Sequence, residues 1–106
     1  MSPAGQTQVR LGVDLIEHKK AQDFYQRHKD HLDKFFTVEE IFYIGRRSGA
    51  ARRLAEVLAM KEAAFKASDK IWMGPRGFGK KLSEKNNSKM ILIKSKKYVV
   101  AQCVGN

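Results

Sequence analysis

Apolar and polar residues alternate near the start of the chain. From Val9 to Leu15 every second residue is a valine or a leucine, and the residues between them are arginine, glycine and aspartate. A period of two residues predicts a half-buried β-strand. Asp14 therefore lies late in this strand, on the opposite face from the valines and leucines.

Helical patterns dominate the middle of the chain. The long polar segment 19–34 is expected to be a helix. Thr37 followed by Glu40 has the spacing of a capping box and predicts that a second helix begins there. A longer helix is predicted over residues 50–68, where apolar side chains recur at helical spacing.

The residue pattern changes after this long helix. Residues 74–79 are rich in glycine and predict a loop, whereas 90–93 and 98–104 are rich in β-branched and aromatic residues and predict two strands. The link 94–97 is short enough for a hairpin. The order β-α-α-α-loop-β-β predicts an α+β domain, with a small antiparallel sheet packed against a long central helix.

Length and composition favour one domain covering residues 1–106, with 1–7 as a flexible lead-in. The lone cysteine, Cys103, excludes an internal disulfide and any multi-cysteine metal site. No apolar run approaches the roughly 20 residues of a membrane span, and the N-terminal residues lack the pattern of a signal peptide. A cytoplasmic protein is therefore expected.

The net charge of +10 indicates an anionic partner. Lysines and arginines outnumber acids by 21 to 11, and the excess is spread along the whole chain. Nucleic acid, a phosphate-rich cofactor and an acidic protein are all candidates. Charge alone does not choose among them, although nucleic acid comes first by base rate.

One stripe of the predicted long helix carries candidate chemistry. Ala55, Ala59, Glu62 and Lys66 share a face, so two small residues are followed by a carboxylate and an ammonium one turn apart. The simplest interpretation is a surface ion pair, because Glu before Lys at i,i+4 stabilises many helices by a few tenths of a kcal/mol.

Asp14 makes a second interpretation possible. A lone carboxylate in an apolar strand is costly to bury unless it is paired or binds a metal. One carboxylate from a strand and one from a packed helix match the way proteins hold Mg²⁺, which keeps several waters and takes substrate phosphate oxygens as further ligands. Nearby lysines would then act as point charges on those phosphates.

At these residues the chain resembles the holo-acyl-carrier-protein synthases. Residues 12–17 (GVDLIE) are similar to the Gly-x-Asp-φ-φ-Glu strand of that family, where φ is apolar, and residues 61–67 (KEAAFKA) to its Lys-Glu-Ala-x-x-Lys-Ala helix. Residues 35–40 resemble its Phe-x-Thr-x-x-Glu helix start, and 98–102 its Tyr-Ala-Val-Ala-Gln strand. Each motif is weak alone, but four in the right order are a strong signal.

The resemblance implies a phosphopantetheinyl-transferase-like fold and transfer of phosphopantetheine from coenzyme A to a serine of an acyl carrier protein. It implies that Asp14 and Glu62 bind Mg²⁺ and that Lys61 and Lys66 contact phosphates. A metal-bound water, Glu62 or Lys66 could act as the general base, and the sequence does not choose among them. Glu17 matches a family acid with a supporting role.

The resemblance also implies partners. Basic residues of the first helix, with Lys20 and Arg27 as the candidates and Lys19 nearby, would dock the acidic carrier protein; the alternative is an ordinary solvated helix face. A homotrimer is expected by analogy with the family. The holo-carrier product would serve fatty-acid or polyketide biosynthesis, between which the sequence does not decide.

Three departures from the family pattern stand out. Val57 replaces an arginine, whose contact is either lost or supplied by Arg52 or Arg53, and Lys94 replaces a histidine. The stretch between Ala67 and Met90 is also shorter than usual. These differences leave two alternatives open: a catalytically silent relative that binds carrier protein or coenzyme A, and a small basic nucleic-acid-binding domain.

Overall fold

The computed structural model describes residues 10–68 and 89–105 of the chain. The predicted lead-in 1–7 and the predicted loop 74–79 lie outside these residues. In chain order the elements are β1 (Arg10–Glu17), α1 (His18–His28), the 3₁₀ turn η1 (Leu32–Lys34), α2 (Val38–Ile44), α3 (Ala50–Ala67), β2 (Lys89–Lys94) and β3 (Tyr98–Gly105).

The three described strands form one antiparallel sheet in the order β1-β3-β2. The C-terminal strand β3 lies in the centre, and Asp14 of β1 pairs with Ala101 of β3, which pairs with Leu92 of β2. The predicted hairpin between β2 and β3 is present, and the amide of Ser95 donates to the carbonyl of Tyr98 at 2.9 Å. The α+β prediction is confirmed.

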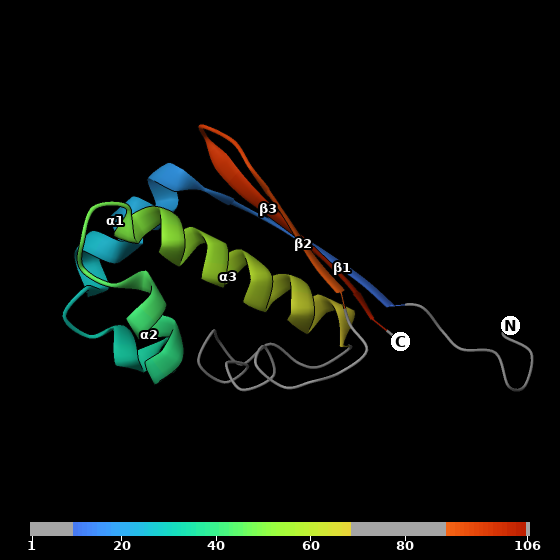
Figure 1. Ribbon diagram of the computed structural model, residues 1–106, viewed down its shortest axis with the longest axis horizontal. Coiled ribbons are helices and arrows are strands. Elements are labelled where there is room, and N and C mark those ends of the chain that lie inside the picture. The colour runs from blue at the N-terminus through green and yellow to red at the C-terminus, as the bar shows by residue number, and fades with distance from the viewer. Residues whose placement is uncertain (1–9, 69–88, 106) are drawn as a thin grey trace, which may run out of the picture.

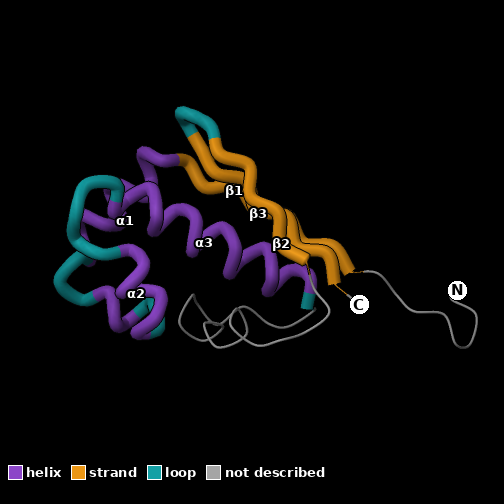
Figure 2. Tube along the Cα trace, viewed as in Figure 1, coloured by secondary structure: helices purple, strands orange, loops and turns teal. Residues whose placement is uncertain are grey.

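The helices of the described residues lie on one side of this sheet, and α3 runs along it (Figures 1 and 2). The strand face that meets α3 is the one that carries Gly12, Asp14 and Ile16. The valines and leucines of β1 lie on the other face and are 45–57% exposed. The alternation predicted for β1 is therefore correct, and the half of the strand that is covered is the half that carries the aspartate.

Close approach of β1 and α3 depends on small residues. A Cβ atom on Gly12 would collide with the carbonyl oxygen of Ala63 and the amide nitrogen of Ala67. Ala59 and Ala63 of the same helix and Ala101 of the central strand are all fully buried. Strand and helix backbones therefore come closer here than larger side chains would allow.

Helices α1 and α2 pack against α3 and complete the core. Thr37 caps α2 as predicted: its side chain accepts from the amide of Glu40, and the Glu40 carboxylate accepts from the amide of Thr37 at 2.9 Å. Among the described residues, none of the helices has the length and apolarity to cross a bilayer. The cytoplasmic location stays a prediction.

Candidate functional site

The fold brings Asp14 and Lys66 into direct contact although 52 positions separate them along the chain. The Nζ atom of Lys66 lies 2.9 Å from Oδ1 of Asp14 and 3.2 Å from the carbonyl oxygen of Val13. Helical spacing places Glu62 one turn before Lys66 on the same side of α3. The strand acid, the helix acid and the lysine of the two sequence motifs therefore meet at one place.

The two acids of this cluster share a partly buried environment. Burial raises the pKa of Glu62 to about 8, and a hydrogen bond to Asp14 and the charge of Asp14 act in the same direction, whereas the Lys66 charge opposes them. A hydrogen bond between two carboxyl groups requires a proton on one of them, because two carboxylates have no donor between them. Oδ2 of Asp14 is buried and has no donor among the described residues.

This donor set fits a hard divalent cation. It offers carboxylate oxygens from two elements, one of them a buried oxygen that lacks a hydrogen-bond donor. Within residues 10–68 and 89–105 no group of three or more His, Cys, Asp or Glu side chains converges on one point. Two carboxylates with room for water and phosphate ligands are typical of Mg²⁺ and not of a structural zinc site.

Lys61 has a different position from the one expected for a phosphate ligand. Its side chain is 0% exposed. Its Nζ atom lies 2.7 Å from Oε1 of Glu40, 3.4 Å from the carbonyl of Phe35 and 5.2 Å from the centre of the Phe36 ring. Burial lowers the pKa of Lys61, and Glu40 opposes that change. A ligand cannot reach this ammonium in the structure, so we leave Lys61 out of the proposed phosphate-binding set.

The predicted partner-binding residues of α1 line a common hollow. Lys20 and Arg27 are exposed and line a hollow of about 490 Å³, together with Leu15, Phe24 and Leu58. Lys19 is exposed outside this hollow.

Glu17, the predicted supporting acid, also lines this hollow. It lies 3.9 Å from Lys20 and on the opposite sheet face from Asp14, because the two residues are three apart in a strand.

A second buried acid, Glu56, is one that the sequence analysis missed. Its carboxylate accepts a hydrogen bond from the Tyr43 hydroxyl and lies 3.6 Å from Nζ of Lys94, the lysine that replaces the family histidine. The hydrogen bond to Glu56 raises the pKa of Tyr43. Tyr43 lies in α2 and Lys94 in β2, whereas Glu56 lies in α3. No local sequence pattern predicts contacts between such distant elements.

The arginine positions also have clear roles. Val57 is buried in α3, and Arg53 donates to the carbonyls of Ile44, Arg47 and Ser48. Arg53 therefore holds the α2–α3 loop, and its side chain is committed to that contact. Arg52 is exposed, so of Arg52 and Arg53 it is the one whose side chain can contact a ligand.

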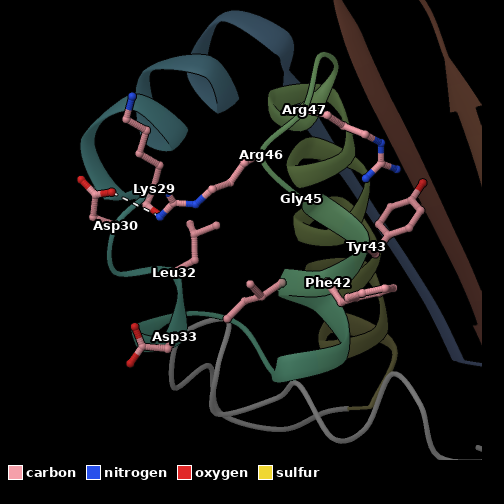
Figure 3. Close-up of a pocket in the computed structure, with 10 residues that line it drawn as sticks. Lys29, Asp30, Leu32, Asp33, Phe42, Tyr43, Gly45, Arg46 and Arg47 are labelled. Atoms are coloured by element: carbon pink, nitrogen blue, oxygen red, sulfur yellow. Dashed lines mark hydrogen bonds and ion pairs between the residues drawn. The ribbon is translucent and has the colours of Figure 1, made fainter.

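The larger of the two described hollows lies elsewhere, beside α2 (Figure 3). It measures about 720 Å³, and Arg46 reaches across one side of it to Asp30 at 3.3 Å. Phe42 and Tyr43 project from α2 in the same view. None of the predicted site residues lines this hollow. We therefore do not include it in the candidate site, although it is the larger of the two.

Comparison with known proteins agrees with the motifs and the fold. The model of the family described as "4'-phosphopantetheinyl transferase superfamily" matches residues 10–103. The chain belongs to this superfamily. The match includes both the strand that carries Asp14 and the helix that carries Glu62 and Lys66, and it confirms the family predicted from the four motifs.

Curated relatives within this superfamily carry one name. A holo-[acyl-carrier-protein] synthase of Clostridium perfringens is 37% identical over 70 residues, which are 66% of this chain and 50% of that protein. That of Clostridium kluyveri is 28% identical over 100 residues, or 91% of this chain and 72% of that protein. The chain thus spans about half the length of the former relative.

A solved structure from the superfamily shows the same fold. It is a holo-(acyl-carrier-protein) synthase from Bacillus anthracis in complex with CoA (3',5'-ADP), with a TM-score of 0.63 and 20% identity. The match covers 90% of this chain and 93% of that one. At this identity the likeness concerns the architecture alone.

Proposed function

We propose that this chain is a Mg²⁺-dependent holo-acyl-carrier-protein synthase. It transfers 4'-phosphopantetheine from coenzyme A to a serine of an apo-acyl carrier protein and releases adenosine 3',5'-bisphosphate. The observation that carries the proposal is the convergence of Asp14 with the helix segment of Glu62 and Lys66, since two acids and a lysine suit a metal-bound pyrophosphate. Membership of the superfamily supports the same chemistry.

Each residue of the cluster has a definite task in this proposal. Asp14 and Glu62 hold Mg²⁺ through their carboxylate oxygens, and Mg²⁺ supplies charge neutralisation at the pyrophosphate. Lys66, whose side chain is 53% exposed, reaches the phosphate oxygens. The serine oxygen forms a bond to the β-phosphorus, and the bond from that phosphorus to the bridging oxygen breaks.

The serine proton needs an acceptor within the site. Glu62 and Lys66 are the candidates that this chain offers. The leaving adenosine bisphosphate carries the electron pair of the broken bond.

The carrier protein docks on α1. Lys20 and Arg27 provide positive charge in the lining of the hollow described above, and Phe24 and Leu58 provide apolar surface there. This combination suits an acidic partner that also presents apolar side chains. Replacing Lys20 and Arg27 together by glutamate is expected to raise the KM for carrier protein at least about tenfold, with little change for coenzyme A.

The active assembly is a homotrimer. The sheet face away from the helices carries Leu11, Val13, Leu15, Ile91, Ile93 and Tyr98, all of which are at least 40% exposed. Six exposed apolar side chains on one face of a sheet need a cover, and three copies arranged around a three-fold axis would cover one another. Light scattering on the wild-type chain should give three times the monomer mass, and Val13→Asp should give a monomer. A monomeric wild type would contradict the assembly.

The decisive experiment measures transfer directly. The chain is incubated with apo-acyl carrier protein, coenzyme A and Mg²⁺, and the mass of the carrier protein is followed. We expect the phosphopantetheine increment with the wild type, and its loss with Asp14→Ala and with Glu62→Gln. Full activity in either variant would contradict the site.

Binding without turnover would identify the chain as a silent relative. Salt-sensitive binding of generic DNA, with no transfer, would favour the nucleic-acid alternative.

A further inference from the structure

Lys66 lies directly on an acid that is proposed to bind the metal. Its ammonium is 2.9 Å from Oδ1 of Asp14, and its second contact is the carbonyl of Val13 at 3.2 Å. Asp14 is 14% exposed in this pair. The ammonium therefore places a positive charge at one of the two oxygens that a divalent cation would use.

This contact has an electrostatic consequence. A divalent cation held by Asp14 and Glu62 would lie within a few ångströms of the Lys66 charge, and two like charges at that distance repel strongly in a partly buried site. The carboxylates alone therefore attract the cation weakly. A phosphate group that took the ammonium away from Asp14 would remove the repulsion and add oxygen ligands.

Lys66 is free to make that exchange. Its side chain is 53% exposed. It lies in the last turn of α3, where the helix dipole stabilises the ammonium both in contact with Asp14 and in contact with a phosphate nearby. Lys61 in the same motif is 0% exposed and pairs with Glu40, so it cannot take part. The exchange depends on one flexible side chain and needs no backbone movement.

We propose that Lys66 is a built-in counter-ion that makes binding of the divalent cation conditional on a pyrophosphate-bearing ligand. The ammonium neutralises Asp14 when that ligand is absent and passes to the phosphates when it binds. The cation and coenzyme A therefore bind cooperatively. This inference rests on the proposed function, because it concerns the same site.

The test measures the affinity for Mn²⁺, used as a paramagnetic probe, from the amplitude of the free-ion signal with and without coenzyme A. The wild type should bind Mn²⁺ weakly alone and much more tightly with coenzyme A. Lys66→Gln should bind Mn²⁺ alone roughly tenfold more tightly, and the gain on adding coenzyme A should shrink by at least about tenfold.

Two control variants separate local charge from other causes. Lys34→Gln removes an equal charge from an exposed position in η1 and should bind Mn²⁺ like the wild type. Lys66→Arg retains the charge and should also resemble the wild type in Mn²⁺ binding without coenzyme A. Circular dichroism checks that each variant is folded.

The outcomes distinguish this inference from the proposed function. If the wild type binds Mn²⁺ with coenzyme A, but Lys66→Gln binds Mn²⁺ alone no more tightly than the wild type, the counter-ion role is wrong and the metal site stands. If Lys66→Arg behaves like Lys66→Gln, charge is not the cause and the inference also fails. If the wild type binds no Mn²⁺ under either condition, the metal site and the proposed function both fail.

Discussion

Two lysine–carboxylate pairs on α3 have the same chemistry and opposite settings. Lys61 and Glu40 are 0% and 9% exposed and form a pair enclosed by Phe35 and Phe36. Lys66 and Asp14 are 53% and 14% exposed and lie at the edge of the sheet. Only five positions separate the two lysines, so one short motif supplies both a charge sealed in the core and a charge that a ligand can reach.

The difference shows that two lysines of one motif can have different roles because one side chain is buried and the other is exposed. A buried ion pair needs both partners, since removing one leaves an uncompensated charge in a low-dielectric environment. A pair near the surface is screened by water and contributes little to stability. We therefore assign Lys61 to holding α2 on α3, whereas Lys66 is accessible to a ligand, as the proposed function requires.

The largest expected effect concerns the buried pair. Glu40→Gln keeps an oxygen for the capping box but removes the charge that faces Lys61. We expect a loss of about 3 kcal/mol in the free energy of unfolding, because the Lys61 ammonium stays buried without a counter-ion. Urea denaturation at pH 7 measures this loss.

A matched double variant tests the cause. Glu40→Gln combined with Lys61→Met removes both charges and should recover more than half of that loss. A double variant as unstable as Glu40→Gln would show that the charge of Lys61 is not responsible.

The second effect is a pH dependence at the other pair. Burial and the neighbouring Asp14 raise the pKa of Glu62 from 4.5 to about 8. Between these values the folded chain holds a proton that the unfolded chain has lost, so this residue lowers stability as pH rises through that range. Glu62→Gln should remove the decline. We expect it to be about 2 kcal/mol more stable than the wild type at pH 9 in chelator, which is under half of the unscreened value of about 5 kcal/mol, because Glu62 is only partly buried.

Denaturation curves from pH 4 to pH 9 would test this directly. The difference between Glu62→Gln and the wild type should widen from about pH 4.5 to pH 8 and level off above it. A difference that does not change with pH would mean that the acid is not perturbed in the way described.

The smallest effect concerns the exposed lysine. Lys66→Gln should change the free energy of unfolding at pH 7 by less than about 0.5 kcal/mol, although we expect it to alter ligand binding strongly. Thermal unfolding in 50 mM and 500 mM salt would measure it. A loss as large as that of Glu40→Gln would remove the contrast between the two pairs.

Much of the fold followed from local patterns in the sequence. The order of the elements, the capping box at Thr37 and the bounds of α3 depend on residues that are near neighbours in the chain, and the structure confirms them. The grouping of Asp14 with Glu62 and Lys66 was expected from the resemblance of the two motifs to the family. Strand alternation and helical spacing define faces within each element, and only the structure shows that Asp14 and Lys66 are in contact.

Other features depend on partners that are distant in the chain. The alternation in β1 defines two faces but does not tell which one α3 covers, and the covered face carries Gly12 and Asp14. The pairing of Lys61 with Glu40 spans 21 positions, and that of Glu56 with Lys94 joins α3 to β2. No periodicity encodes such contacts, so these roles came only from the three-dimensional arrangement.

The missing side chain at Gly12 has a consequence for the chemistry. The distance between Asp14 of β1 and Glu62 of α3 depends on how closely the two backbones approach. That approach is possible because Gly12 has no side chain and α3 presents alanines to it. One added methyl group at Gly12 would push the C-terminal turns of α3 away from β1 and widen the gap that the proposed metal ion would bridge. The geometry of this site is therefore most sensitive to substitution at Gly12, a residue that has no functional group.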